Sequence, residues 1–263
     1  MRNLREIIDP LHIEDLRNEL HPSIFDINEL YDLLIIRIPM ITDEVNAHSF
    51  AFIITHEESY IYDKEKQEFE ELENHLLGVY FFINKKIDRL LKSFIKYQEM
   101  VSDMEESLYA NNTDDNFLNN WLSVKLEVLR IERILVRTAD TVSEFIKSHK
   151  KHESFPENSY EDIYEHIERT SRSALLQLSK LDYLYSFYNA KSNDKMNKMI
   201  YILTIISAIF LPLNLVVGFF GMNTSGLPFA GGVNGTYFAV SLMLTLGVIT
   251  YIAVQSWRKK IEK

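Results

Sequence analysis

Cysteine is absent from this chain, so disulfide scaffolds and thiolate metal sites are excluded. Also missing are a Gly-rich phosphate loop, a nucleophile elbow and a metalloprotease histidine pair, and the carboxylates are spread along helix faces as solvated surface. These absences argue against an enzyme. Residues 1–20 are charged and lack the apolar core of a signal peptide, so membrane targeting must come from another part of the chain.

Charge is absent from residues 199–257, which contain no Asp, Glu, Lys, Arg or His, although 25% of the whole chain is charged. Two apolar runs, residues 199–220 and 237–257, fill most of this stretch. As helices they are each roughly 32 Å long, close to the thickness of the bilayer hydrocarbon. Neither run has the polar face that a core helix of a soluble protein shows. The sequence therefore predicts two transmembrane helices.

Basic residues flank both predicted spans, whereas the loop between them, residues 221–236, carries no charge. The positive-inside rule then places both termini in the cytoplasm and the loop outside, in a multi-pass protein of the inner (plasma) membrane. The flanking bases are Lys195 and Lys198 before the first span, and Arg258, Lys259 and Lys260 after the second.

The part of the chain before the first span is acidic. The chain has 38 Asp and Glu and 28 Lys and Arg, and only one acid and four bases lie beyond Lys198, which leaves residues 1–198 with a net charge of −13. This excess argues against a nucleic-acid partner, because phosphates bind basic surfaces. It suits a domain that attracts cations.

Residues 30–70 have the composition of β-strands. Runs rich in Ile, Leu, Phe and Tyr cover residues 33–38, 48–55 and 60–62, and polar segments typical of turns separate them. The first run ends at Pro39. We therefore expect about three strands, which need a helical cover.

Three helical patterns follow the strands. Apolar residues at helical spacing cover residues 72–109 and 117–149, and two such helices with a short polar turn form an antiparallel hairpin. His149 and His152, at the Lys-rich end of the second helix, are expected to be solvated and not bound to a metal. The third pattern starts near Tyr160 and runs into the first apolar run, so as one helix it is roughly 90 Å long.

These patterns predict an α+β membrane protein, in which a strand-containing domain with a long helical hairpin precedes a very long helix that becomes the first span. Such a helix can carry a cytoplasmic signal to the membrane. The expected order is a cytoplasmic strand-plus-hairpin domain (1–159), a stalk helix (160–198), the first span (199–222), an outer loop (223–236), the second span (237–257) and a basic tail (258–263).

Two helices cannot enclose a pore, so a two-span protein that transports must be an oligomer. Polar residues in the first span favour this reading, because an Asn in mid-span is costly unless it meets water, an ion or a partner helix. The alternative is that Asn214 and Ser207 only join helices and that the spans are an anchor. Counting back from Asn223 in helical steps places one stripe on the span and on the turns before it: Gly218, Asn214, Leu211, Ser207, Leu203 or Thr204, Ile200, Asn197 and Asn193.

The first apolar run ends in Gly221-Met222-Asn223. Asn193 and Asn197-Lys198-Met199 lead into it, and Phe210-Leu211-Pro212-Leu213 and Gly218 lie within it. With its two C-terminal spans and basic end, the chain resembles the CorA family of divalent-cation channels, whose signature is Gly-Met-Asn at the outer end of the first span. The resemblance covers about residues 160–263, and residues 30–150 only by pattern.

The resemblance implies a funnel-shaped homopentamer in the lipid bilayer, with the first spans lining the pore. Gly221, Met222 and Asn223 would form the outer mouth, where a ring of amide oxygens accepts hydrogen bonds from the waters of a hydrated Mg²⁺. Asn214 would add a second polar ring, and Leu211, Ile200 and Leu203 an apolar constriction that gates by dewetting.

In the family, metal bound between cytoplasmic domains holds the pore shut, and Asp162 matches a position that takes part in this sensing. Alternatively, Asp162 is an acid near a helix N-terminus, where the helix dipole favours it. Lys195, Lys198 and residues 258–260 would form a basic collar at the inner mouth, or serve only as a topology signal.

The resemblance implies uptake of Mg²⁺, with Co²⁺ or Ni²⁺ also carried. The outer loop after Asn223 lacks acidic residues and is similar to that of the ZntB branch, so a zinc transporter, with or without proton coupling, is the alternative. Neither span contains the carboxylate or His that a proton relay needs. A membrane-anchored scaffold that does not transport is the third hypothesis. The choice between Mg²⁺ and Zn²⁺, proton coupling and the regulatory metal site stay open.

Overall fold

The computed structural model describes residues 4–42, 45–110, 112, 116–152, 154–222 and 232–261. The chain forms two compact units, Met1–Ser186 and Phe187–Lys263. The division falls within one helix, α5 (Glu157–Phe220), which contributes to both units.

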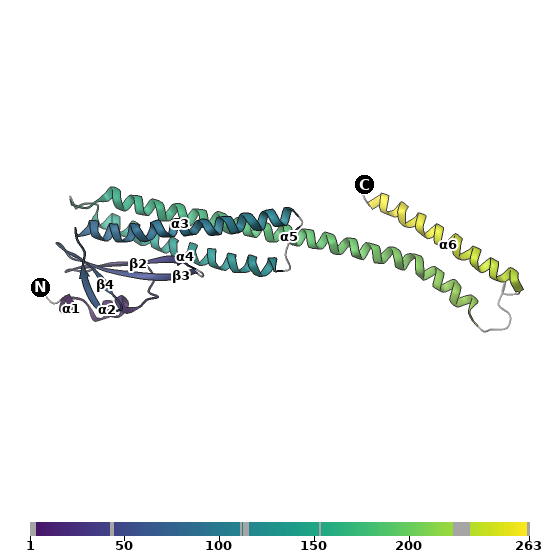
Figure 1. Ribbon diagram of the computed structural model, residues 1–263, viewed down its shortest axis with the longest axis horizontal. Coiled ribbons are helices and arrows are strands. Elements are labelled where there is room, and N and C mark those ends of the chain that lie inside the picture. The colour runs from purple at the N-terminus through teal and green to yellow at the C-terminus, as the bar shows by residue number, and fades with distance from the viewer. Residues whose placement is uncertain are drawn as a thin grey trace. The chain divides into compact units, whose positions relative to one another are not determined.

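A five-stranded antiparallel sheet lies in the first unit, with its strands in chain order (Figure 1). The central strands pair over ten positions, for example Leu34 with Phe52. The sheet contains all three predicted runs, and it adds a strand at each edge. The strands are β1 (Ile24–Ile27), β2 (Asp32–Ile41), β3 (Val45–Ile54), β4 (Ser59–Asp63) and β5 (Glu68–Glu71).

Strand β2 continues through Pro39, where the sequence predicts its end. Proline has no N–H to give to a neighbouring strand, so it is confined to edges and bulges. Strand β1 pairs with β2 only as far as Ile35, and Pro39 is paired with Ala47 of β3 on the other side. The missing N–H therefore falls on a side of β2 that has no strand beside it.

Helices cover both faces of the sheet. Leu33 and Ile35 pack in one apolar cluster with Ile8 and Leu16, from the segment that holds α1 (Leu4–Ile7) and α2 (Pro10–Arg17). Successive side chains of a strand point to opposite faces. On the other face Phe52 meets Phe82 of α3 (Leu76–Tyr109), with ring centroids 5.6 Å apart. Burial on both faces explains why β2 is a continuous apolar run.

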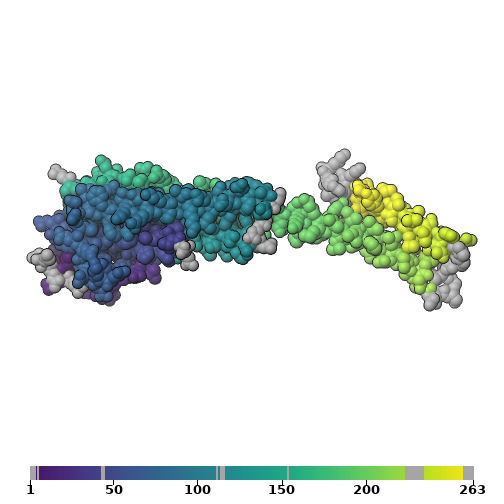
Figure 2. Space-filling model, in the orientation of Figure 1, coloured from purple at the N-terminus to yellow at the C-terminus, as the bar shows by residue number. Residues whose placement is uncertain are grey.

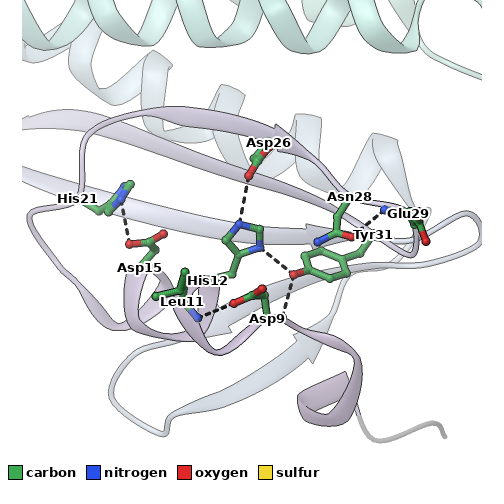
Figure 3. Close-up of polar contacts among 9 residues, drawn as sticks. All are labelled: Asp9, Leu11, His12, Asp15, His21, Asp26, Asn28, Glu29 and Tyr31. Atoms are coloured by element: carbon green, nitrogen blue, oxygen red, sulfur yellow. Dashed lines mark hydrogen bonds and ion pairs between the residues drawn. The ribbon is translucent and has the colours of Figure 1, made fainter.

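Helix α2 is held to the sheet by a polar network around His12 (Figure 3). The His12 Nδ1 lies 2.7 Å from the Tyr31 hydroxyl, and its Nε2 lies 3.1 Å from Asp26 Oδ2 of β1. The backbone N–H of Asp9 donates to the same hydroxyl over 2.9 Å, and the Asp9 carboxylate caps α2 by accepting from the Leu11 N–H. The sequence analysis predicts neither α1 nor α2, because they are too short to show a clear period.

The helical hairpin consists of α3 and α4 (Phe117–His149), which confirms the predicted pattern. Helix α3 begins at Leu76 and not near Leu72, because Asn74 and His75 have positive φ angles of 66° and 48° that interrupt a helix there.

The first part of α5 packs on the hairpin. The Trp121 indole N–H donates to the Leu181 carbonyl over 2.8 Å, and its ring stacks on Tyr185 at 4.7 Å. The buried Tyr160 hydroxyl donates to the Leu76 carbonyl over 2.8 Å, and burial raises the Tyr160 pKa. Much of the segment expected as a stalk is thus part of the first unit.

Replacing Ile35 by Ala is expected to destabilise the first unit, because Ile35 is fully buried between the sheet and α2. The loss is about 2–5 kcal/mol, the usual cost of a large-to-small change in a core. Ile27→Ala is the matched control, since Ile27 is 63% exposed in the same sheet and should cost about 0.5 kcal/mol or less. Thermal unfolding of the purified variants measures both, and equal midpoints would contradict the assigned core.

Candidate functional site

The second unit contains the uncharged stretch. The apolar parts of α5 and α6 (Gly232–Ile261) are each long and apolar enough to cross a membrane, and nearly all their side chains lie at the surface of the single chain (Figure 2). Helix α6 begins at Gly232, so it extends beyond the apolar run that starts at Tyr237. Asn223 lies outside the described residues, as do the other residues up to 231.

Two faces of α5 differ in exposure between Asn197 and Phe220. One face, at helical spacing, consists of the residues expected to line a pore, and all of these are exposed: Asn197, Ile200, Leu203, Thr204, Ser207, Leu211, Asn214 and Gly218. The opposite face is partly covered at Ile205, Ala208, Ile209, Pro212, Leu213 and Phe220, and Val216 is buried. The expected stripe therefore lies within the exposed part of the helix, which also includes Phe210, Leu215 and Val217.

Three polar side chains on this face have different chemistry. The Thr204 hydroxyl donates to the Ile200 carbonyl of its own helix over 2.8 Å, so its hydrogen is not presented to a ligand. Ser207 and Asn214 lie two turns apart on the same face and are exposed. An amide there is costly in lipid unless water, an ion or another helix meets it.

Pro212 lies inside α5, on the opposite face from Asn214. Its ring nitrogen cannot bond to the Ala208 carbonyl, so one backbone acceptor of this helix lacks its usual partner. In lipid a proline is tolerated where such a carbonyl is met by a neighbouring helix or by water.

Two glycines near the end of α5 differ in what surrounds them. The Gly221 N–H donates to the Val217 carbonyl over 2.8 Å, and a Cβ added to Gly221 would lie 2.9 Å from that same oxygen. A Cβ added to Gly218 meets nothing within 4 Å. The backbone of the same helix therefore leaves no room for a side chain at Gly221, whereas a side chain at Gly218 would meet open space in the single chain. Met222 follows and is 48% exposed.

The expected regulatory residue Asp162 lies on the first turns of α5. Its side chain is half-exposed, and its Oδ1 is 3.7 Å from His166 Nε2, one turn along. Within the described ranges, no group of three or more His, Asp or Glu side chains is placed to hold a metal ion. A metal at Asp162 would therefore need ligands from a second chain, and its regulatory role stays a prediction.

The expected basic collar is only partly described. Lys195 and Lys198 are exposed, and the Lys198 ammonium pairs with Asp194 one turn earlier, at 2.7 Å. Residues 258–260 continue α6, and their side chains lie outside the described part. The collar also stays a prediction.

The expectation that His149 is solvated is wrong. The residue is 8% exposed, and its Nε2 lies 3.1 Å from Asp32 Oδ2 at the start of β2. Phe155 returns against the ring, with centroids 5.7 Å apart, and this covers the helix end. The spacing of Phe145, His149 and Phe155 is the sequence signal for this burial. The neighbouring lysines instead suggest a solvated helix end.

Residues 2–258 match the family described as CorA-like Mg²⁺ transporter protein. The chain belongs to this family. Among curated relatives, it is 23% identical over 68% of its length to a putative metal ion transporter, YfjQ, of Bacillus subtilis, and 22% identical over 63% to the zinc transport protein ZntB of Vibrio parahaemolyticus. The matched parts span 56% and 50% of these relatives' own lengths.

Solved structures of CorA-type proteins share the fold. The CorA magnesium transporter of Methanocaldococcus jannaschii superimposes with a TM-score of 0.76 over 95% of this chain and 84% of that one, at 17% identity. The full-length CmaX protein gives a TM-score of 0.72 over 95% and 82%, at 16% identity. Both matches include the strand-containing unit and the apolar helices.

Replacing Gly221 by Ala should lower the thermal unfolding midpoint more than replacing Gly218 by Ala does. The first change forces a Cβ against a backbone oxygen of its own helix, and the second enters open space in the single chain. The two variants are matched in chemistry and lie on the same segment, so each serves as the control for the other. A larger loss for Gly218→Ala than for Gly221→Ala would contradict this assignment.

Proposed function

We propose that this chain carries hydrated divalent metal cations through the membrane, with Mg²⁺ as the main cargo and Co²⁺ or Ni²⁺ also accepted. The observation that carries the proposal is the exposed stripe of α5, which places Ser207 and Asn214 on the open face of a helix without charge. Family membership supports it, as do relatives named cobalt/magnesium transport protein CorA in Methanocaldococcus jannaschii and Thermotoga maritima.

The pore is formed by several copies of the chain. One copy offers two membrane helices, which cannot enclose an aqueous path, so the stripes of several α5 helices meet around an axis. Five copies in a funnel are what the family resemblance implies. The second helix, α6, then lies outside the ring, where its exposed apolar residues, such as Leu244 and Ile249, suit lipid.

The outer mouth is the selective part of this pore. Gly221 follows the last residue of α5, Met222 comes next, and Asn223 supplies one amide oxygen per copy. Mg²⁺ loses its waters reluctantly, so neutral oxygens that accept hydrogen bonds from those waters hold the ion without trapping it. A ring of carboxylates would bind the ion more tightly and slow its passage.

Deeper in the pore, Asn214 and Ser207 form polar rings between apolar ones. Leu211, Leu203 and Ile200 are 69%, 64% and 54% exposed, and copies of these side chains around an axis form a constriction that excludes water when narrow. Passage of an ion then requires the α5 helices to move apart.

The first unit lies in the cytoplasm together with both termini, as the flanking bases indicate. Metal bound between neighbouring copies at Asp162 holds the pore shut. The half-exposed Asp162 side chain leaves room for a second chain's ligand, and the acidic character of residues 1–198 makes bridging cations favourable between copies.

Zinc transport is the second candidate, and two observations favour it. The curated relatives include ZntB proteins of two organisms, at 22% and 34% identity, the latter over 26% of this chain. The outer loop lacks the acidic residues that would collect Mg²⁺. Proton coupling by a carboxylate or His within the spans is not possible, since residues 199–257 contain neither.

Replacing Asn223 by Ala should abolish Mg²⁺ flux into liposomes while the oligomer stays assembled, because the change removes the ring of amide oxygens at the outer mouth. Assembly is checked by size-exclusion chromatography of the same preparation. Asn119→Ala is the matched control: this Asn is exposed on α4 in the first unit, away from the stripe, and should leave flux within about twofold of wild type. Flux that persists in Asn223→Ala would refute the role of the outer ring.

Side-by-side uptake of Mg²⁺ and Zn²⁺ by the purified protein in liposomes should show Mg²⁺ entering faster, driven by the metal gradient and voltage alone. No pH gradient is needed, because the spans contain no group that could carry a proton. Faster Zn²⁺ uptake would support the second candidate. Uptake that requires a pH gradient would overturn the channel mechanism.

A further inference from the structure

A groove lies beside α1 in the first unit, at one end of the sheet. Its volume is about 610 Å³, within the range of sites for small ligands. The turn between β1 and β2 and the turn between β3 and β4 both lie at this end, because the strands are antiparallel and follow chain order. Neither the expected pore residues nor Asp162 belong to this groove.

The groove follows a row of cross-strand partners. Paired positions across β2, β3, β4 and β5 place this row on one face of the sheet: Leu33, Ile53, Tyr60 and Glu71. Leu33 and Ile53 are buried in the cluster that α1 and α2 cover, whereas Tyr60 is partly exposed and Glu71 is exposed. The helical cover therefore ends within the row, and Tyr60 and Glu71 form one wall of the groove.

Apolar residues form much of the lining. Ile8 and Tyr31 are buried at the base of the groove, and Leu4 and Ile7 beside them are partly exposed. Leu30, on the turn between β1 and β2, is 60% exposed. These side chains offer a hydrocarbon surface that an apolar part of a ligand can cover.

Four carboxylates lie around this apolar surface, on the two turns and on β5: Glu29, Glu57, Glu58 and Glu71. Within the described residues none of the four has an ion-pair partner, in contrast to Glu70, whose Oε1 lies 2.6 Å from Lys66 Nζ. Among the described residues that line the groove, none is Lys or Arg, and the one histidine is His56. The negative charge of the groove is therefore not balanced by its own lining.

Hydrogen bonds fix the two turns that present these carboxylates. The Glu29 backbone N–H donates to Asn28 Oδ1 over 2.7 Å (Figure 3), and the Thr55 N–H donates to the Glu58 carbonyl over 2.9 Å. The Tyr60 hydroxyl donates to the Glu58 carboxylate. This hydrogen bond, burial and the charges of Glu58 and Glu71 raise the Tyr60 pKa to about 12.

A bare metal ion does not suit this arrangement. A metal needs several oxygens around one point, and no three His, Asp or Glu side chains of the described ranges are grouped in that way. Carboxylates spread over two turns and a strand instead suit a ligand whose positive charges are separated by hydrocarbon.

We propose that this groove binds an aliphatic polyamine. Its methylene chain lies on Leu30 and on the apolar side chains of α1, and its ammonium groups, with three N–H donors each, bond to the surrounding carboxylates. The site uses only residues of the first unit, so it does not depend on the proposed transport function.

Titration calorimetry of the full chain in detergent tests the site, with spermidine as the ligand and excess Mg²⁺ present to fill metal sites elsewhere. Spermidine should bind, and n-butylamine, which has a similar chain with a single ammonium group, should bind at least about tenfold more weakly. No binding of spermidine, or equal affinity for the two amines, overturns the proposal.

Two variants make the assignment specific to the groove. Glu71→Gln should weaken spermidine binding about tenfold through loss of one charged hydrogen bond. Leu30→Ser removes exposed hydrocarbon and should weaken it about threefold. Glu68→Gln is the matched control, because Glu68 is exposed on the opposite face of β5 and should leave the affinity within about twofold. Unchanged affinity in both groove variants, or an equal loss in Glu68→Gln, overturns the proposal.

Asn223→Ala separates this site from the proposed pore. Its affinity for spermidine should equal that of wild type, whatever its effect on ion flux. A loss of spermidine binding in Asn223→Ala would place the amine in the pore and overturn the groove as its site.

Discussion

Lipid does not hydrogen-bond to amides or hydroxyls, and this constraint governs the second unit of the protein. Residues 199–257 contain no charge, yet α5 has Ser207 and Asn214 on one exposed face and Pro212 on the other. A helix of this composition is stable in a bilayer only if its polar face meets water, an ion or another helix. The exposed stripe and the open space at Gly218 fit the proposal that copies of α5 complete this polar face in an oligomer.

The first unit packs against the early part of α5. The sheet is buried on both faces, and α3 and α4 form a frame on which α5 packs through Tyr160 near its start and through Trp121 and Tyr185 near Ser186. Helix α5 runs from Glu157 to Phe220 and contributes residues to both units. Asp162, the residue for which regulatory metal binding is proposed, lies on the early turns of this helix.

Sequence patterns predict the parts of this fold that repeat over many residues. The hairpin and the two apolar helices are clear because dozens of residues share one period, and α4 has the predicted bounds. The edge strands β1 and β5 and helices α1 and α2 are too short for a period, and they depend on contacts with distant segments such as Tyr31 with His12. The stripe on α5 can be predicted from residue spacing alone. The burial of His149 cannot, because His149 contacts Asp32 at the start of β2, which is distant in the sequence.

The central claim is that the Ser207 and Asn214 face of α5 borders water, and thiol accessibility tests it most directly. The chain has no cysteine, so single cysteines can be placed without altering any native thiol. In membranes containing the full chain, Ser207→Cys and Asn214→Cys should react with a charged, membrane-impermeant thiol reagent, whereas Ile209→Cys and Leu213→Cys on the opposite face should not. Reaction at all four positions, or only at the last two, would contradict an aqueous path along this face.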